Sequence, residues 1–86
     1  MKKVTMFVMK GCPYCRQAFK WMDELMQQYP EYSDVELTVI DETEQPDVAD
    51  QWDYYYVPTY FVGQEKLHEG AATKDKIQRV FERALK

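Results

Sequence analysis

The sequence predicts an α/β fold in which one small mixed four-stranded sheet is flanked by about three helices. Strand-like and helix-like patterns alternate along the chain in the order β-α-β-α-β-β-α, which is typical of helices packed on the faces of one sheet. The chain has 86 residues, of which 45% are hydrophobic and 15% aromatic. That length leaves room for a single modest core. We therefore expect residues 1–86 to form one domain.

The first half of the chain predicts a strand, a helix and a second strand. Residues 4–9 are a nearly continuous apolar run, as in a central strand buried on both faces. A helix that starts at Pro13 and ends before Pro30 is indicated because apolar residues recur there at helical spacing. Alternating residues predict the second strand at 35–40. The two strands should be parallel, because a helix connects them.

The second half of the chain predicts a short helix, a hairpin of two strands and a last helix. Pro46 favours a helix from Asp47 to about Asp53, since proline is common in the first turn of a helix. Residues 59–62 and 66–69 are expected to pair as strands across a turn at residues 63–64. Thr73 is a suitable N-cap for the last helix. The apolar residues of that helix fall at helical spacing: Ile77, Val80, Phe81, Ala84 and Leu85.

The charge pattern limits the classes of partner. The net charge is −4, and residues 21–65 contain acids but no Lys or Arg. An acidic chain lacks the basic face that nucleic acid requires, so no nucleic-acid partner is expected. No apolar run is long enough to span a membrane, and the start of the chain lacks a cleavable signal pattern, so we expect a cytoplasmic protein. The acidic middle either forms a solvated surface or steers partners by charge.

The only two cysteines, Cys12 and Cys15, allow three interpretations. A structural disulfide between them would close a very small loop and stabilise the chain little. A zinc site normally needs four ligands, and the chain adds only one histidine, His68. A metal site is therefore expected only if two subunits share it. The third interpretation is a pair of thiols that cycles between dithiol and disulfide.

The position of the pair favours this redox interpretation. Cys12 is expected near the N-cap of the first helix, where free backbone N–H groups and the positive end of the helix dipole stabilise a thiolate. Lys10 and Arg16 add positive charge nearby. Cys15 lies three residues further on, within disulfide reach, and on the apolar face of the helix. We expect the Cys15 thiol to be more buried, with a higher pKa than that of Cys12.

Three segments make the chain resemble the glutaredoxins of the thioredoxin superfamily. They are Cys12-Pro13-Tyr14-Cys15 after the first strand, Tyr56-Val57-Pro58-Thr59 before a later strand, and Gly70-Ala71-Ala72-Thr73 before the last helix. The resemblance covers almost the whole chain and implies a thioredoxin-like fold. It implies that Cys12 is the nucleophile, that Cys15 is the resolving thiol, and that Pro58 is a cis-proline beside them. The backbone of Val57 would then pair with an extended substrate.

The resemblance also implies a substrate or glutathione site, formed by Lys10, Tyr14, Val57, Pro58, Gly70, Ala71 and Thr73. Three positions depart from the glutaredoxin pattern. Met9 occupies the position at which glutaredoxins share a lysine, and the nearest lysine here, Lys10, is one residue further along the chain. Ala71 replaces the second glycine of a pair, and Thr73 replaces an aspartate.

These observations predict a monomeric thiol–disulfide oxidoreductase that reduces protein disulfides or glutathione mixed disulfides through Cys12 and Cys15. No bound cofactor is expected, and glutathione is the expected reducing co-substrate. One alternative keeps the chemistry but takes electrons from a flavoenzyme of the thioredoxin reductase kind. Two further alternatives are a dimer that binds a metal or cluster and a redox-inactive adaptor on the same fold.

Overall fold

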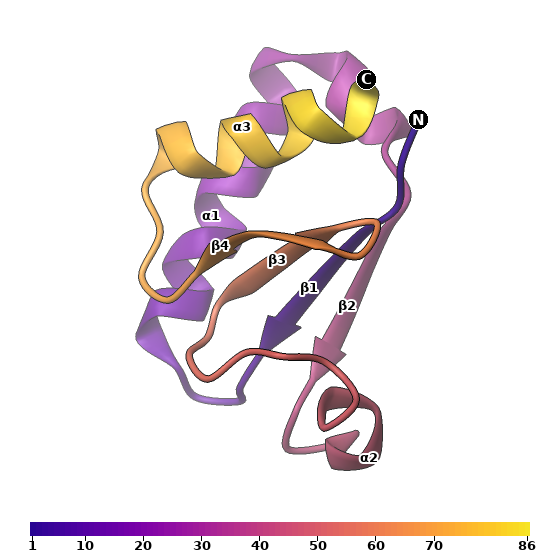
Figure 1. Ribbon diagram of the computed structural model, residues 1–86. Coiled ribbons are helices and arrows are strands. Elements are labelled where there is room, and N and C mark those ends of the chain that lie inside the picture. Colours follow the sequence, from indigo (N-terminus) through magenta and orange to yellow (C-terminus); the bar gives the residue numbers. More distant parts are fainter.

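The computed structural model describes residues Met1 to Lys86 and contains one mixed four-stranded sheet (Figure 1). Strand β1 lies inside the sheet, parallel to β2 and antiparallel to β3, and β3 pairs with β4 as a hairpin. The strand order is β2-β1-β3-β4. The strands are β1 (Val4–Val8), β2 (Leu37–Asp41), β3 (Thr59–Val62) and β4 (Glu65–Glu69). The predicted fold class is confirmed.

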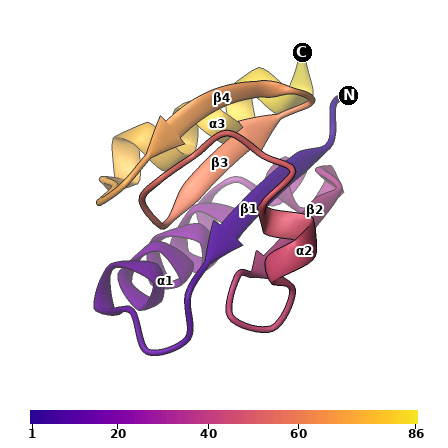
Figure 2. The same ribbon diagram turned by 60° about the horizontal axis from the view of Figure 1, so that its bottom comes forward.

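The helices cover the two faces of the sheet unequally. They are α1 (Pro13–Gln28), η1 (Pro30–Asp34, a 3-10 helix), α2 (Pro46–Ala49) and α3 (Lys74–Leu85). Helices α1 and α3 lie together on one face, whereas the short α2 and the segment after it lie on the other (Figure 2). Successive residues of a strand point to opposite faces. Accordingly, Met6 belongs to the core under α1 and α3, and Phe7 to the core under α2.

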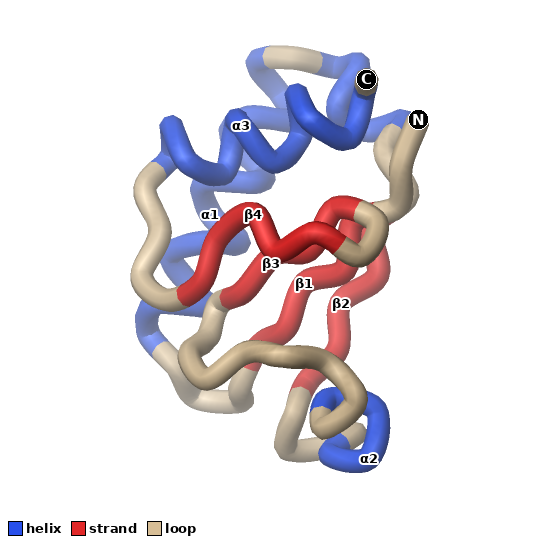
Figure 3. The backbone as a smooth tube through the Cα atoms, in the orientation of Figure 1, coloured by secondary structure: helices blue, strands red, loops and turns tan.

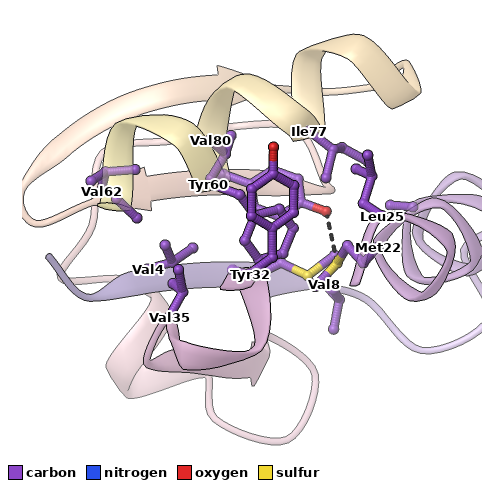
Figure 4. Close-up of a cluster of buried hydrophobic side chains, with 14 of the residues drawn as sticks. Val4, Val8, Met22, Leu25, Tyr32, Val35, Tyr60, Val62, Ile77 and Val80 are labelled. Atoms are coloured by element: carbon purple, nitrogen blue, oxygen red, sulfur yellow. Dashed lines mark hydrogen bonds between the residues drawn. The ribbon is translucent and has the colours of Figure 1, made fainter. Parts of the chain in front are cut away.

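The larger core lies between the sheet and the pair α1 and α3 (Figure 4). The ring of Tyr32 is fully buried and stacks on Phe81, with 5.0 Å between ring centroids. Its hydroxyl donates a hydrogen bond of 2.6 Å to Glu82. The Tyr60 hydroxyl donates to the Met22 sulfur at 3.1 Å, the dashed contact in Figure 4. Each buried hydroxyl therefore has a partner, as burial requires.

The smaller core contains Phe7, Ile40, Ala49 and Phe61. Trp52 lies against Phe61 with 4.8 Å between ring centroids, and Tyr54 stacks on Phe7 at 4.5 Å. These two aromatic side chains come from the segment that follows α2. Aromatic rings thus cover a sheet face that α2 is too short to cover alone.

Three details differ from the predictions. Helix α2 ends at Ala49 rather than near Asp53, because the chain turns there and Trp52 packs on the sheet instead. The helix η1 and its buried Tyr32 were not predicted, since a single tyrosine in a polar stretch gives no periodicity. Val39 of the predicted second strand is 40% exposed, because it lies on the edge strand β2. Its partner in the register is Met6, so it faces the α1 side of the sheet rather than α2.

The remaining boundaries agree closely with the sequence patterns. Thr73 is the N-cap of α3, and its hydroxyl accepts a hydrogen bond from the Lys76 N–H at 3.2 Å. The hairpin turns at Gly63, whose φ of 60° suits glycine. None of the helices has both the length and the apolar character needed to cross a bilayer.

Candidate active site

The two cysteines lie where β1 passes into α1, at one end of the sheet. The loop between β1 and α1 and the loop that leads into β3 lie side by side there (Figure 3). Gly11 has a φ of 82°, a conformation that glycine adopts without strain, and it turns the chain out of the strand. Cys12 then forms the N-cap of α1, with Pro13 as the first helical residue. Both thiols are free.

The environment of Cys12 favours its thiolate form. Desolvation works to raise the pKa of Cys12, but donor groups at the start of the helix outweigh it. These donors are the backbone N–H and the thiol of Cys15 and the backbone N–H of Tyr14. The positive charge of Arg16 acts in the same direction. The pKa of Cys12 is therefore lowered from its ordinary value of 9.0, as the sequence predicted.

The environment of Cys15 favours its protonated form. This thiol is 3% exposed and belongs to the larger core, and burial raises its pKa to about 11. A hydrogen bond with the Met9 backbone acts to lower the pKa of Cys15, while Cys12 and the carboxylate of Glu42 act to raise it further. The pair thus consists of one activated sulfur and one protonated sulfur. This is the arrangement that nucleophilic attack followed by resolution requires.

Cys12 opens into a groove of about 430 Å³. The groove lies between the start of α1, the residue after β2 and the loop that leads into β3. Its lining residues are Met9, Lys10, Gly11, Cys12, Pro13, Tyr14, Glu42, Tyr55, Tyr56 and Val57. Four of them are large side chains that are substantially exposed: Met9, Tyr14, Tyr55 and Tyr56. A contiguous exposed apolar surface of this kind is typical of a binding site.

The Val57–Pro58 peptide bond is cis, as the resemblance implied. Pro58 is fully buried, whereas Val57 lines the groove. No hydrogen bond within the chain uses the backbone N–H or C=O of Val57. Because a backbone donor and acceptor need partners, this pair is available to an extended peptide laid along the groove.

The structure does not bring all the predicted ligand residues together. Lys10, Tyr14 and Val57 line the groove with Cys12. Ala71 lines a separate pocket of about 370 Å³ that shares Pro13 and Tyr14 with the groove. Thr73 lines neither pocket, and its hydroxyl is engaged as the N-cap of α3.

Gly70 also lies outside the lining of both pockets. Its backbone N–H donates to the Pro58 carbonyl at 2.9 Å, so the residue ties the end of β4 to the cis-proline. Its φ of 90° is one that residues with a side chain rarely adopt.

Sequence reasoning missed Glu42 as a residue of the site. It follows β2 directly, lines the groove and accepts a hydrogen bond from the Tyr54 hydroxyl at 2.9 Å. A signal was present, because β1 and β2 are parallel and the carboxyl ends of parallel strands meet at one edge. Cys12 and Glu42 both come shortly after those ends.

No group of three or more His, Cys, Asp or Glu side chains is placed so that it could hold a metal ion. The single histidine, His68, directs Nε2 at the carbonyl oxygens of Gly70 and Ala71, at 2.9 and 3.1 Å. This ring nitrogen therefore already has hydrogen-bond partners in the backbone.

Comparison with known proteins identifies the family. The thioredoxin family model matches residues 2–83. Thioredoxin O1 from Arabidopsis thaliana, in its oxidized state, superposes with a TM-score of 0.71 at 26% identity, over 100% of this chain and 79% of that one. Mitochondrial thioredoxin 3 from Saccharomyces cerevisiae superposes with a TM-score of 0.74 at 24% identity, over 95% of this chain and 77% of that one. A search of curated proteins returned no similar sequence. Because the family model spans nearly the whole chain, the protein belongs to the thioredoxin family.

Proposed function

We propose that the protein is a thiol–disulfide oxidoreductase that reduces protein disulfides or glutathione mixed disulfides. The observation that carries the proposal is the opposed pair of thiols. The pKa of Cys12 is lowered at the mouth of a groove, and that of Cys15 is raised in the core three residues away. Membership of the thioredoxin family supports the same chemistry.

The reaction follows from this pair in two displacements. The Cys12 thiolate attacks one sulfur of the substrate disulfide, forms a mixed disulfide and releases the other sulfur as a thiolate, which takes a proton from water. Cys15 then gives its proton to water and attacks the Cys12 sulfur, and the second substrate thiolate leaves and takes a proton from water. The substrate gains two electrons, and the protein is left with a disulfide between Cys12 and Cys15.

Substrate recognition uses the groove beside Cys12. The unpaired N–H and C=O of Val57 bind the backbone of an extended segment that carries the disulfide. Exposed rings of Tyr14, Tyr55 and Tyr56 contact its side chains. Such a site is open enough to accept proteins as well as small disulfides.

We further propose glutathione as the reductant that restores the dithiol. Two glutathione thiols would provide the two electrons and leave as glutathione disulfide. The Cys-Pro-Tyr-Cys motif supports this choice, and Lys10 offers a cation in the groove for a glutathione carboxylate.

A flavoenzyme of the thioredoxin reductase kind is a second candidate reductant. It is favoured by the contacts at the start of α3, where glutathione would place its other carboxylate. Lys74 there pairs with Glu24 at 3.1 Å, and the Thr73 hydroxyl is engaged as a cap. A protein reductant would not need these groups.

A coupled assay separates the two reductants. The oxidised protein is mixed with a small mixed disulfide and NADPH. One arm adds glutathione and glutathione reductase, and the other adds thioredoxin reductase. We expect NADPH consumption in the glutathione arm, and a Cys12→Ser variant should remove it. Turnover only with thioredoxin reductase would replace glutathione by the flavoenzyme, and no turnover in either arm would contradict the proposed function.

A further inference from the structure

Tyr55, Tyr56 and Val57 form one wall of the groove. They belong to residues 53–57, hereafter the aromatic segment. The segment belongs to no helix or strand, so backbone ladders do not hold it. Tyr54 is anchored by stacking on Phe7 and by its hydrogen bond to Glu42. The next two rings are not anchored, because Tyr55 is 83% and Tyr56 71% exposed. Some other contact must fix the part of the segment that faces Cys12.

Two residues make such contacts. The Thr59 hydroxyl donates to the Tyr56 carbonyl, and the carboxylate of Glu69, at the end of β4, binds the N–H groups of the segment. One of its oxygens, Oε2, accepts from the backbone N–H groups of both Tyr55 and Tyr56, at 2.5 and 3.0 Å. The other oxygen, Oε1, accepts from Lys66 Nζ at 2.8 Å. Lys66 Nζ also donates to the Asp53 carbonyl at 3.2 Å. Two side chains of β4 thus hold the aromatic segment at its first residue and near its middle.

This network is better shielded from water than the other ion pairs of the chain. The side chains of Lys66 and Glu69 are 34% and 20% exposed. In the remaining pairs both side chains are at least 37% exposed. Less exposed charges are screened less by salt, so this pair is the best placed to hold a loop.

The charge of Glu69 is present throughout the neutral range. Donation from Lys66 and from the N–H groups of Tyr55 and Tyr56 lowers the pKa of Glu69 to about 2. The residue after Glu69 adds a further tether, since the Gly70 N–H donates to the Pro58 carbonyl at 2.9 Å. The end of β4 is therefore hydrogen-bonded to the chain on both sides of Val57, to Tyr55 and Tyr56 before it and to Pro58 after it.

We infer that Glu69, held by Lys66, is a positioning residue that fixes the aromatic segment in its substrate-binding arrangement. The inference rests on the proposed function and specifies how its groove is kept preformed. If the segment were free, substrate binding would have to order it, and the entropic cost would weaken binding. Glu69 lies outside the groove lining, so it acts through Tyr55, Tyr56 and Val57 rather than on the sulfur.

The test compares Glu69→Ala and Glu69→Gln with a matched control, Glu65→Ala. Glu65 lies on the same strand and pairs with Arg83 at 2.9 Å, away from the groove. A peptide disulfide is the substrate, and KM and kcat are measured separately. Two further readouts are the ultraviolet thiolate titration of Cys12 and the hydrogen exchange of the Tyr55 and Tyr56 amides.

We expect Glu69→Ala to raise KM by about tenfold while kcat changes little, because only the ordering of the segment is lost. Exchange of the Tyr55 and Tyr56 amides should accelerate, and the Cys12 titration should stay unchanged. Glu69→Gln should fall between wild type and Glu69→Ala, since its amide oxygen still accepts from both N–H groups but forms no ion pair with Lys66. Glu65→Ala should resemble wild type.

An unchanged KM in Glu69→Ala would overturn the inference, and so would an equal rise in Glu65→Ala. If Glu69→Ala does not fold, Glu69→Gln and Lys66→Met decide by the same readouts. If the wild-type protein shows no turnover, the proposed function has failed. Hydrogen exchange of the Tyr55 and Tyr56 amides then decides whether Glu69 fixes the segment. Unchanged exchange in the Glu69 variants would overturn the inference about Glu69 too.

Discussion

Cys12 and Cys15 lie at the two ends of the first turn of α1, and the pKa values of their thiols are shifted in opposite directions. Cys12 is the N-cap of α1 and opens into the groove, and its pKa is lowered by donors at the helix start. Cys15 lies on the inner side of the same helix, and burial raises its pKa to about 11. Only two residues, Pro13 and Tyr14, lie between them. The comparison shows that position relative to the helix end and the core, rather than the residue type, shifts the two thiol pKa values in opposite directions.

The largest expected effect comes from removing the activated sulfur. Cys12→Ser should lower turnover of a disulfide substrate by roughly 10³-fold or more, because a serine hydroxyl is not ionised near neutral pH and cannot replace the thiolate. The measurement is NADPH consumption in the coupled assay, with circular dichroism as a check that the variant folds. A variant that kept a tenth of wild-type turnover would show that Cys12 is not the nucleophile.

Removing the sulfur of Cys15 should leave the first displacement intact. In Cys15→Ser, Cys12 still attacks a protein disulfide, but no thiol resolves the product. The mixed disulfide should accumulate at about one equivalent per chain, visible by intact mass spectrometry, whereas Cys12→Ser should trap none. If Cys15→Ser trapped no adduct, or if Cys12→Ser trapped one instead, the assigned roles of the two thiols would be wrong.

The core behind Cys15 should carry more stability than the outer side of α1. Leu25 lies on the same buried helix face and is 1% exposed, whereas Phe19 is 40% exposed. Leu25→Ala should reduce the free energy of unfolding by about 2–5 kcal/mol, because it leaves a cavity. Phe19→Ala should cost about 1 kcal/mol or less, since a large part of the Phe19 side chain already faces water and no buried cavity is left. Urea unfolding measures both, and equal losses would contradict the unequal burial.

The smallest expected effect concerns the charge near Cys12. Arg16 contributes to the lowered pKa of Cys12, but less than the hydrogen-bond donors do. Arg16→Gln should therefore raise that pKa slightly and slow alkylation of Cys12 near pH 6 by about twofold to threefold. Lys20→Gln removes an exposed charge one helical turn further away and serves as the control. A similar slowing in both variants would indicate a general charge effect rather than a local one.

Much of this architecture could be predicted from the sequence. Strand β1 and helices α1 and α3 have strong apolar patterns, and Pro13 marks the start of α1, so Cys12 could be placed at a helix end. Pro58 could be placed beside the thiols only through the resemblance, because no local pattern indicates that two distant loops meet.

The missed features depend on contacts between distant segments. Tyr32 becomes a core residue through contacts with distant side chains such as Phe81, and α2 ends early because Trp52 packs on the sheet. Glu69 accepts from N–H groups that lie 13 and 14 residues earlier in the chain. Backbone donors carry no residue-specific signal, so such a contact leaves no pattern in the sequence.

The measurement that tests the central claim most directly is the rate of alkylation of each cysteine as a function of pH. The reduced wild-type protein is treated with iodoacetamide for short times, and the modified residue is identified by mass spectrometry. Since only the thiolate reacts, the rate at Cys12 should rise with pH through a midpoint below 9.0. Cys15 should stay unmodified until much higher pH, in line with its pKa of about 11. Equal modification of both thiols with a shared midpoint near 9.0, or earlier modification of Cys15, would contradict the account.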